Sequence, residues 1–197
     1  MMWDHKTPGI PDSEFERAER VPITKEEVRA IQISKARLNS GDTVYDVGCG
    51  SGSVSVEAGL QVEGRGRVFA IDVDPDAVTL TKRNLAKFAV GNASVILGNA
   101  LDKVAGLPAA DSIFVGGTGG DTADIVTLCE ERLKAGGRIV IGVIQIETLA
   151  AVLGVLDRLR FESVDVTQVT VAKSRKTSTG TMMLARNPVT IISATRA

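Results

Sequence analysis

The sequence predicts an α/β protein built on one mostly parallel sheet of seven to eight strands, with a C-terminal antiparallel hairpin. Short runs rich in β-branched residues alternate with helical stretches, and this alternation is typical of βαβ units and a parallel sheet. A glycine-rich turn at residues 48–52 joins the first of these runs to a helical stretch. Two strand-like runs follow each other without a helix in the last part of the chain, which indicates the hairpin.

The chain is expected to begin with an extended arm over residues 1–22, followed by a single domain over residues 23–197. The arm contains three prolines and lacks apolar periodicity. The next segment, ITKEEVRAIQISKARL, has helical periodicity, and Thr24 followed by Glu27 predicts a capping box at its start. This helix is expected to end near residues 39–41, Asn-Ser-Gly.

The remaining elements follow in order. Strands are expected at residues 43–47, 67–72, 94–97, 112–115 and 138–143. Helices are expected between them at residues 53–61, 74–88 and 121–133, and after the fifth strand at residues 148–159. The helix at 74–88 is expected to start at Asp74, with Pro75 in its first turn. The last two strands are expected at residues 164–171 and 182–194, with the polar, basic segment 173–180 as the loop of the hairpin.

Charge and composition narrow the function. The 197 residues carry 23 basic and 24 acidic side chains, so no broad electrostatic attraction to nucleic acid is expected. No apolar stretch approaches the ~20 residues that span a bilayer, and the polar N-terminus does not resemble a signal peptide. Two cysteines give no disulfide framework, so we expect a cytoplasmic protein with reduced thiols and no membrane partner.

The chain has a single histidine, His5, which lies in the expected arm. Histidine is the commonest general base and metal ligand near neutral pH. Serine–histidine hydrolysis and multi-histidine metal sites are therefore excluded, and no metal is expected. The chemistry is expected to use a reactive cofactor, carboxylates, lysines or backbone groups.

The glycine-rich turn lies in the stretch YDVGCGSGSVSVEAG, where Gly48, Gly50 and Gly52 alternate after Asp46. Such a turn between a strand and a helix is typical of nucleotide-like ligands. Asp72 ends the next strand, twenty residues beyond Gly52, where an acid accepts hydrogen bonds from ribose hydroxyls; it is also placed to cap the following helix. A dinucleotide would place its pyrophosphate on the helix N-terminus, and its fingerprint is GxGxxG, whereas this turn reads GxGxG.

The same stretch resembles the motifs of the class I S-adenosylmethionine-dependent methyltransferases. Residues 44–52, VYDVGCGSG, resemble the first motif of that class, an acid followed by GxGxG. Residues 70–72, AID, resemble its ribose-binding second motif, and residues 133–140, LKAGGRIV, resemble its lead-in to the fifth strand. The resemblance implies a Rossmann-like class I methyltransferase fold and S-adenosyl-L-methionine as cofactor.

Further stretches resemble one family of this class, the decarboxylating C15-methyltransferases that act on precorrin-6B or cobalt-precorrin-6B in cobalamin biosynthesis. They are VPIT at 21–24, VGGTGG at 115–120, IET at 146–148 and GTMMLARNPV at 180–189. The resemblance implies methyl transfer to C15 of a tetrapyrrole, decarboxylation of the acetate on C12, and a homotetramer. It also implies cofactor contacts at Thr24, Gly48, Cys49, Gly50, Ser51, Gly52, Asp72 and Ala100.

Substrate-binding residues are expected in two places. Gly116, Gly117, Thr118 and Gly119 form an open backbone turn against which a flat substrate could lie, or a plain connection ended by Asp121 as a helix N-cap. The substrate carries several carboxylates, with which Lys173, Arg175 and Arg186 could pair unless they only form a solvated basic loop.

Two questions of function stay open at the level of sequence. Glu147 is the one weak acid–base candidate, and the reading as a charge at the start of a helix is favoured over it. Methyltransferases of nucleobase amines often carry an Asn/Asp-Pro-Pro-aromatic motif after the fourth strand, and VGGTGG at residues 115–120 lacks it. The alternatives are a methyltransferase acting on RNA or another small molecule, and a module that binds S-adenosylmethionine without transferring its methyl group.

Overall fold

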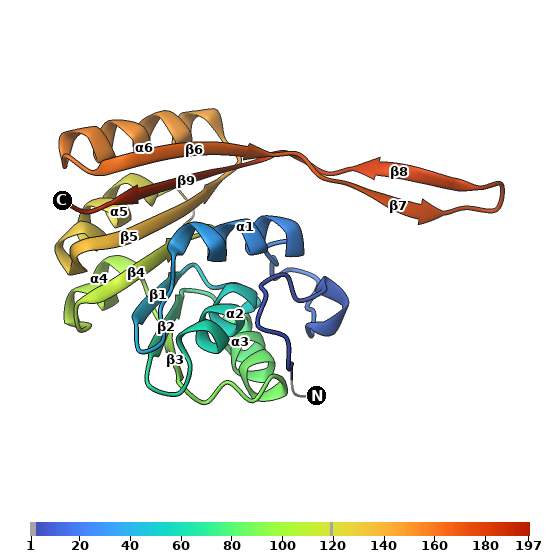
Figure 1. Cartoon of the computed structure of the whole chain (residues 1–197), viewed down its shortest axis with the longest axis horizontal. Coiled ribbons are helices and arrows are strands. Elements are labelled where there is room, and N and C mark those ends of the chain that lie inside the picture. Colours follow the sequence, from blue (N-terminus) through green and yellow to red (C-terminus); the bar gives the residue numbers. More distant parts are fainter. Residues whose placement is uncertain (1–2, 119) are drawn as a thin grey trace.

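A computed structural model describes residues 3–118 and 120–197 of the chain. Seven strands form one sheet in the order β3-β2-β1-β4-β5-β9-β6, and two more, β7 and β8, form a separate hairpin (Figure 1). The helical elements are η1 (Asp12–Glu14), α1 (Glu26–Ala36), α2 (Ser53–Val62), α3 (Pro75–Lys87), α4 (Ala100–Lys103), η2 (Val104–Gly106), α5 (Thr122–Arg132) and α6 (Ile146–Arg158). The strands are β1 (Thr43–Val47), β2 (Arg67–Asp72), β3 (Ala93–Leu97), β4 (Ala110–Val115), β5 (Leu133–Val143), β6 (Glu162–Val169), β7 (Ala172–Lys176), β8 (Thr181–Ala185) and β9 (Val189–Thr195).

The first five strands are parallel, which confirms the predicted α/β fold. In the register of the sheet, Val47 at the end of β1 lies opposite Ile71 on β2 and Val115 on β4. The residues that follow these three strands therefore leave the sheet at one edge. The strand order reverses between β1 and β4, and ligands of open α/β sheets bind at such a switch point.

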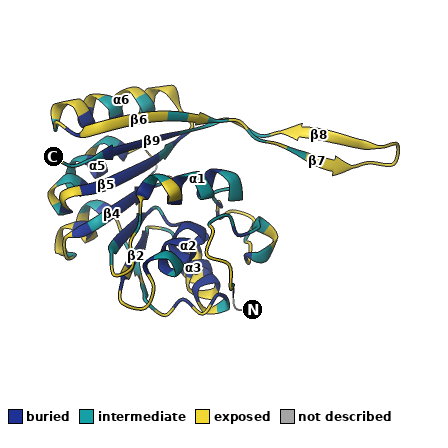
Figure 2. Cartoon of the chain, viewed as in Figure 1, coloured by how far each residue is buried: buried dark blue, intermediate teal, exposed yellow. Residues whose placement is uncertain are grey.

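Helices cover both faces of the sheet. On one face, Ile139 and Ile141 of β5 pack with α5 and α6; on the other, Val140 packs with α1 and α2. Because both faces are covered, most of β1, most of β4 and the second half of β5 are buried (Figure 2). No helix in the described residues is both long and apolar enough to cross a membrane.

Helix α1 begins differently from the prediction. Its N-cap is Lys25, whose side chain makes no capping hydrogen bond, so the capping box of Thr24 and Glu27 is wrong. Glu27 instead forms ion pairs with Lys173 and Arg186 of the hairpin. These partners lie far along the chain, and a local sequence pattern does not reveal them.

The tail is also built differently. Residues 173–180, expected as a loop, contain β7, and only residues 177–180 form the turn to β8. The predicted strand at residues 182–194 is two strands, because Pro188 has no N–H to continue the ladder. β6 and β9 pair antiparallel at the edge of the sheet, and β7 and β8 extend beyond them as a hairpin that projects from the body (Figure 1).

The N-terminal arm packs onto the domain. Ile10 and Phe15 are 1% and 4% exposed and belong to a cluster with residues of α2 and α3. Beside them, the guanidinium of Arg29 is fully buried and donates from Nε to Glu57 Oε1 at 2.6 Å. Glu57 also accepts from the backbone nitrogens of Gly9 and Ile10, at 2.8 and 3.0 Å. This ion pair therefore joins the arm to α1 and α2.

Candidate active site

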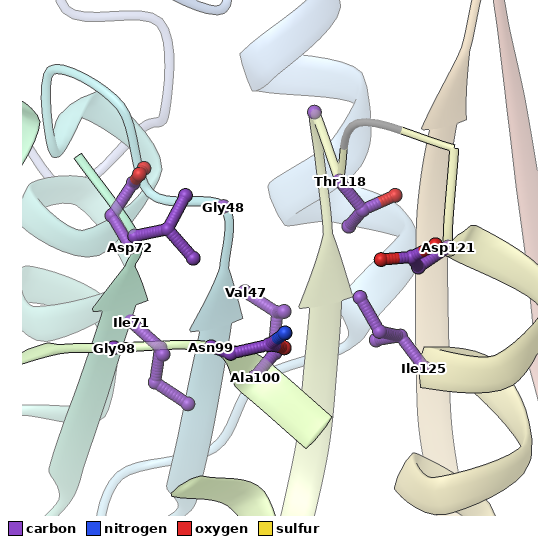
Figure 3. Close-up of a pocket in the computed structure, with 12 residues that line it drawn as sticks. Val47, Gly48, Ile71, Asp72, Gly98, Asn99, Ala100, Thr118, Asp121 and Ile125 are labelled. Atoms are coloured by element: carbon purple, nitrogen blue, oxygen red, sulfur yellow. The ribbon is translucent and has the colours of Figure 1, made fainter. Parts of the chain in front are cut away.

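A cavity of about 390 Å³ opens at the carboxyl edge of the sheet, beside the point where the strand order reverses. Asp72 bounds it on one side, and Thr118 and Asp121 project into it from the opposite side (Figure 3). The residues that line it are Val47, Gly48, Ile71, Asp72, Val73, Gly98, Asn99, Ala100, Gly117, Thr118, Asp121 and Ile125. Three of the expected cofactor residues, Gly48, Asp72 and Ala100, are thus brought together with two of the expected substrate residues, Gly117 and Thr118.

The glycines of the turn are required by its backbone. Gly48, Gly50 and Gly52 have φ angles of +74°, +53° and +75°, a left-handed region that residues with a Cβ rarely occupy. A Cβ at Gly48 would lie 2.8 Å from the carbonyl oxygen of Gly117. The loops that follow β1 and β4 therefore approach each other backbone to backbone, and both face the cavity.

Every N–H of the turn already has a partner within the protein. The amides of Gly48 and Cys49 donate to the carbonyl of Ile71 at 2.9 and 3.1 Å. The Gly50 amide donates to Asp72 Oδ2 at 2.8 Å. The amides of Ser51 and Gly52 donate to the carbonyls of Pro22 and Cys49, at 3.1 and 2.8 Å. The turn therefore has no free donors with which to hold a phosphate.

Asp72 has a fixed carboxylate. Besides the Gly50 amide, its Oδ1 accepts from the backbone nitrogen of Asp74 at 3.0 Å. A carboxylate offers about four lone-pair sites, so two remain for a pair of ligand hydroxyls. The expected alternative, that Asp72 caps the next helix, is wrong, because Asp74 is the N-cap and accepts from Asp76.

Asp46, the acid of the first motif, lies under the turn. It is 3% exposed, and Oδ2 accepts from the hydroxyl of Ser55. The pKa of Asp46 is raised to about 6, mainly by burial; the hydrogen bonds from Ser55 act to lower it, and the charge of nearby Asp72 acts to raise it. Asp46 is therefore a second carboxyl behind the cavity wall rather than in it.

Cys49 and Ser51 are buried, and neither is among the described residues that line the two cavities. Cys49 is in contact with Thr81, its Sγ 3.5 Å from the Thr81 hydroxyl. Burial is the main reason why the pKa of the Cys49 thiol is raised far above its ordinary value. Their roles as cofactor contacts therefore stay predictions.

A second cavity of about 360 Å³ adjoins the first over the ends of β4 and β5. Gly117 and Thr118 line both cavities. The other residues that line it are Gly116, Gly120, Thr122, Gly142, Val143, Ile144, Gln145 and Thr148. Gly119, expected to bind substrate, lies outside the described residues. The two adjoining cavities give room for two ligands that meet at Gly117 and Thr118.

Asp121 was expected only as a helix N-cap. It occupies that position before α5, but its side chain makes no capping hydrogen bond. Its carboxylate projects into the first cavity instead (Figure 3). The sequence pattern also missed Asn99 and Ile125, which line the cavity from α4 and α5. An Asp before a helix reads as a cap, and nothing local in the sequence shows which way it points.

The remaining expected residues lie elsewhere. Lys173 forms ion pairs with Glu26 and Glu27, and Arg186 pairs with Asp12 and Glu27, at the base of the hairpin.

Within the described part of the chain, neither cavity is lined by Thr24, Glu147, Arg175 or the two paired cations. Glu147 is exposed in the first turn of α6, and Arg175 is exposed on β7. The basic residues of the hairpin therefore have partners or lie in solvent, away from both cavities.

The strand order, the left-handed glycine turn after β1 and the acid that ends β2 define a class I S-adenosylmethionine-dependent methyltransferase. The family model described as "Precorrin methyltransferase domain" matches residues 14–196. A relative from Pyrobaculum calidifontis is 47% identical over 195 residues, 98% of this chain and 99% of the relative. That relative bears the name "probable cobalt-precorrin-6B C(15)-methyltransferase (decarboxylating)". The chain belongs to the precorrin methyltransferase family.

Two solved structures agree. One, from Geobacter metallireducens, is titled a precorrin-6y C5,15-methyltransferase. It is 36% identical to this chain with a TM-score of 0.88, and the match covers 97% of this chain and 98% of that one. The other, from Methanobacterium thermoautotrophicum, is titled a precorrin 8w decarboxylase; it has a TM-score of 0.87 and 37% identity, with 94% and 98% covered. The match extends over nearly the whole length of each chain.

Proposed function

We propose that this chain transfers a methyl group from S-adenosylmethionine to C15 of precorrin-6B or cobalt-precorrin-6B, and removes CO2 from the acetate on C12, in cobalamin biosynthesis. The observation that carries the proposal is the pair of adjoining cavities at the switch point of the sheet. They occur in a chain that is 47% identical, over 98% of its length, to a relative with the name of this activity. A methyl donor fills one cavity and the tetrapyrrole lies over the other.

The first cavity suits S-adenosylmethionine, which supplies an electrophilic methyl group on a sulfonium. Asp72 has two lone-pair sites left for the ribose hydroxyls. Gly48 and Gly117 form part of the cavity wall with backbone alone, and a Cβ at Gly48 would clash with the carbonyl of Gly117. Val73 and Ala100 offer apolar surface to a base. Cys49, Gly50, Ser51 and Gly52 hold the turn in shape, and Thr24 stays a predicted cofactor contact.

The electrostatics favour this cofactor over a dinucleotide. All five amides of the turn are bonded within the protein, so a pyrophosphate would find no donors there. Asp72 and Asp121 line the cavity and Asp46 lies behind it, so carboxylates surround the site. Such a site attracts a cation and repels a phosphate.

The second cavity supports transfer over mere binding of the cofactor. It is walled by the glycine backbone of residues 116–117 and by the polar side chains of Thr118, Gln145 and Thr148. Exposed Ile144, 73% accessible, lies at its edge and offers apolar contact to a ring. The chain holds its acceptor against this backbone surface, and positioning beside the methyl donor supplies a large part of the rate. A pure sensor of S-adenosylmethionine has no use for this second cavity.

We further propose that the protein is a homotetramer assembled through the hairpin. The projecting strand β8 exposes Met182, Met183 and Leu184 by 47%, 63% and 38% (Figure 2). Adjacent apolar residues on a strand with one free edge favour association with another copy. The ion pairs of Lys173 and Arg186 with α1 fix the base of the hairpin and thus its direction.

Calorimetric titration with S-adenosylhomocysteine tests the cofactor part of the proposal. We expect saturable binding by the wild type and at least a tenfold weaker Kd for Asp72→Ala, a loss of about 1.4 kcal/mol or more. Asp76→Ala is the matched control, because Asp76 is an exposed residue in the first turn of α3. A wild type that does not bind S-adenosylhomocysteine would refute the methyltransferase function.

A further inference from the structure

The proposed reaction contains a proton transfer for which no group has been assigned. C15 takes the methyl group with its own π electrons, which leaves a positive charge on the ring. The bond between the C12 side chain and its carboxylate breaks as CO2 leaves, and its electron pair enters the ring and cancels that charge. The side-chain carbon then remains as an exocyclic methylene. In either order of events, one proton must move from C15 to this methylene carbon.

Few residues around the cavities can carry a proton. Among the described residues that line either cavity, the titratable side chains are Asp72 and Asp121. Asp72 is engaged by the amides of Gly50 and Asp74, and its remaining sites face the proposed ribose position. Glu147 is exposed on α6 and lines neither cavity in the described structure. Asp121 is the group that remains.

The position of Asp121 suits this role. Its carboxylate projects into the first cavity (Figure 3), while its neighbours Gly120 and Thr122 line the second. It therefore lies at the junction of the two cavities, near Thr118, which lines both. Within the described residues, its side chain has no hydrogen bond or ion pair, and it does not cap α5. A carboxylate without an internal partner is free to accept a proton and to return it.

We propose that Asp121 is the proton-transfer residue of the reaction. This inference rests on the proposed function. The carboxylate of Asp121 takes the proton from C15 as the C–H electron pair restores the conjugation of the ring. The resulting carboxylic acid then gives this proton to the exocyclic methylene, which becomes the C12 methyl group. The two steps leave Asp121 unchanged and consume no external acid, base or oxidant.

The test uses cobalt-precorrin-6B and S-adenosylmethionine with the wild type, Asp121→Asn and Asp121→Glu. Asp124→Asn is the matched control, since Asp124 is an exposed residue of the same helical turn and lines neither cavity in the described structure. We expect Asp121→Asn to form final product about 100-fold or more slowly, the usual contribution of acid–base catalysis. Asp121→Asn should also accumulate the intermediate that carries the exocyclic methylene. This intermediate is an isomer of the product, with the same mass but a different absorption spectrum. Asp121→Glu should restore part of the rate, and Asp124→Asn all of it.

Three other outcomes have distinct meanings. Product formation by Asp121→Asn at the wild-type rate, without the isomer, would overturn the role of Asp121 and leave the proposed function intact. A tenfold weaker Kd for S-adenosylhomocysteine with an unchanged rate at saturation would assign Asp121 to cofactor binding and overturn proton transfer. A wild type that leaves cobalt-precorrin-6B unchanged would refute the proposed function, and this inference with it.

Discussion

The buried ion pair of Arg29 and Glu57 gives the sharpest prediction about stability. Glu57 is 2% exposed and accepts hydrogen bonds from Arg29 and from the backbone of Gly9 and Ile10. Arg29, fully buried, also donates to the carbonyls of Thr24 and Ile10. The substitution Glu57→Gln keeps the shape of the side chain but removes its charge. It also turns one acceptor into a donor that faces N–H groups.

The cost follows from this geometry. Removing one partner of a buried ion pair costs about 3–5 kcal/mol. Without the charge of Glu57, Arg29 keeps, among the described residues, only the longer ion pair to Asp12, at 3.4 Å. For a chain of this size, each kcal/mol corresponds to about 2–4 °C in Tm, so we expect a fall of about 6–20 °C. Because the pair holds the arm, the arm should also detach more often.

Urea unfolding measures the first effect and trypsin digestion the second. The Arg17 and Arg20 sites of the arm should be cut faster in Glu57→Gln than in the wild type. Glu63→Gln is the control, since Glu63 is exposed at the end of α2, and its unfolding free energy should change by no more than about 0.5 kcal/mol. A loss below about 1 kcal/mol in Glu57→Gln would refute the reasoning, because that is less than a buried charge costs.

Three further predictions concern the site and the hairpin. Gly48→Ala forces a Cβ to within 2.8 Å of the Gly117 carbonyl at a φ of +74°, so the Kd for S-adenosylhomocysteine should rise at least tenfold by calorimetry, about 1.4 kcal/mol. Gly64→Ala, with open space around it, should bind normally. Burial raises the pKa of Asp46 from its ordinary value of about 4 to about 6, so its contribution to stability is present below about pH 4 and is lost as the pH rises through 6. Urea unfolding of Asp46→Asn should lack this loss of about 3 kcal/mol between pH 4 and 7, and equal slopes for variant and wild type would contradict it. Met183→Glu should convert the tetramer to smaller species in light scattering, and a wild type that is already monomeric would contradict the assembly.

The sequence predicted the parallel sheet well, for a physical reason. Strands buried on both faces are largely apolar, and such short runs stand out between helices. The glycine turn and Asp72 were also recognisable, because their backbone conformation and spacing leave few other residue types. These features are local, and the structure places Gly48, Asp72 and Ala100 around one cavity.

Features set by distant contacts could not be predicted. The polar strand β7 reads as a loop, and it is a strand because β8 pairs with it. The ion pair of Arg29 and Glu57 joins two helices under the arm, and no local sequence pattern indicates that contact. Helix α4 has four residues, too few for a periodic pattern. The orientation of Asp121 depends on the loop before α5, which the sequence does not specify.

Incubation of the wild type with cobalt-precorrin-6B and S-adenosylmethionine carrying a 13C-labelled methyl group tests the central claim most directly. Mass spectrometry should show a product that has gained one labelled methyl group and lost one CO2, together with one S-adenosylhomocysteine per product. Omitting the methyl donor should abolish the product. A protein that binds S-adenosylhomocysteine but leaves the precursor unchanged, or that instead labels tRNA, would contradict the account.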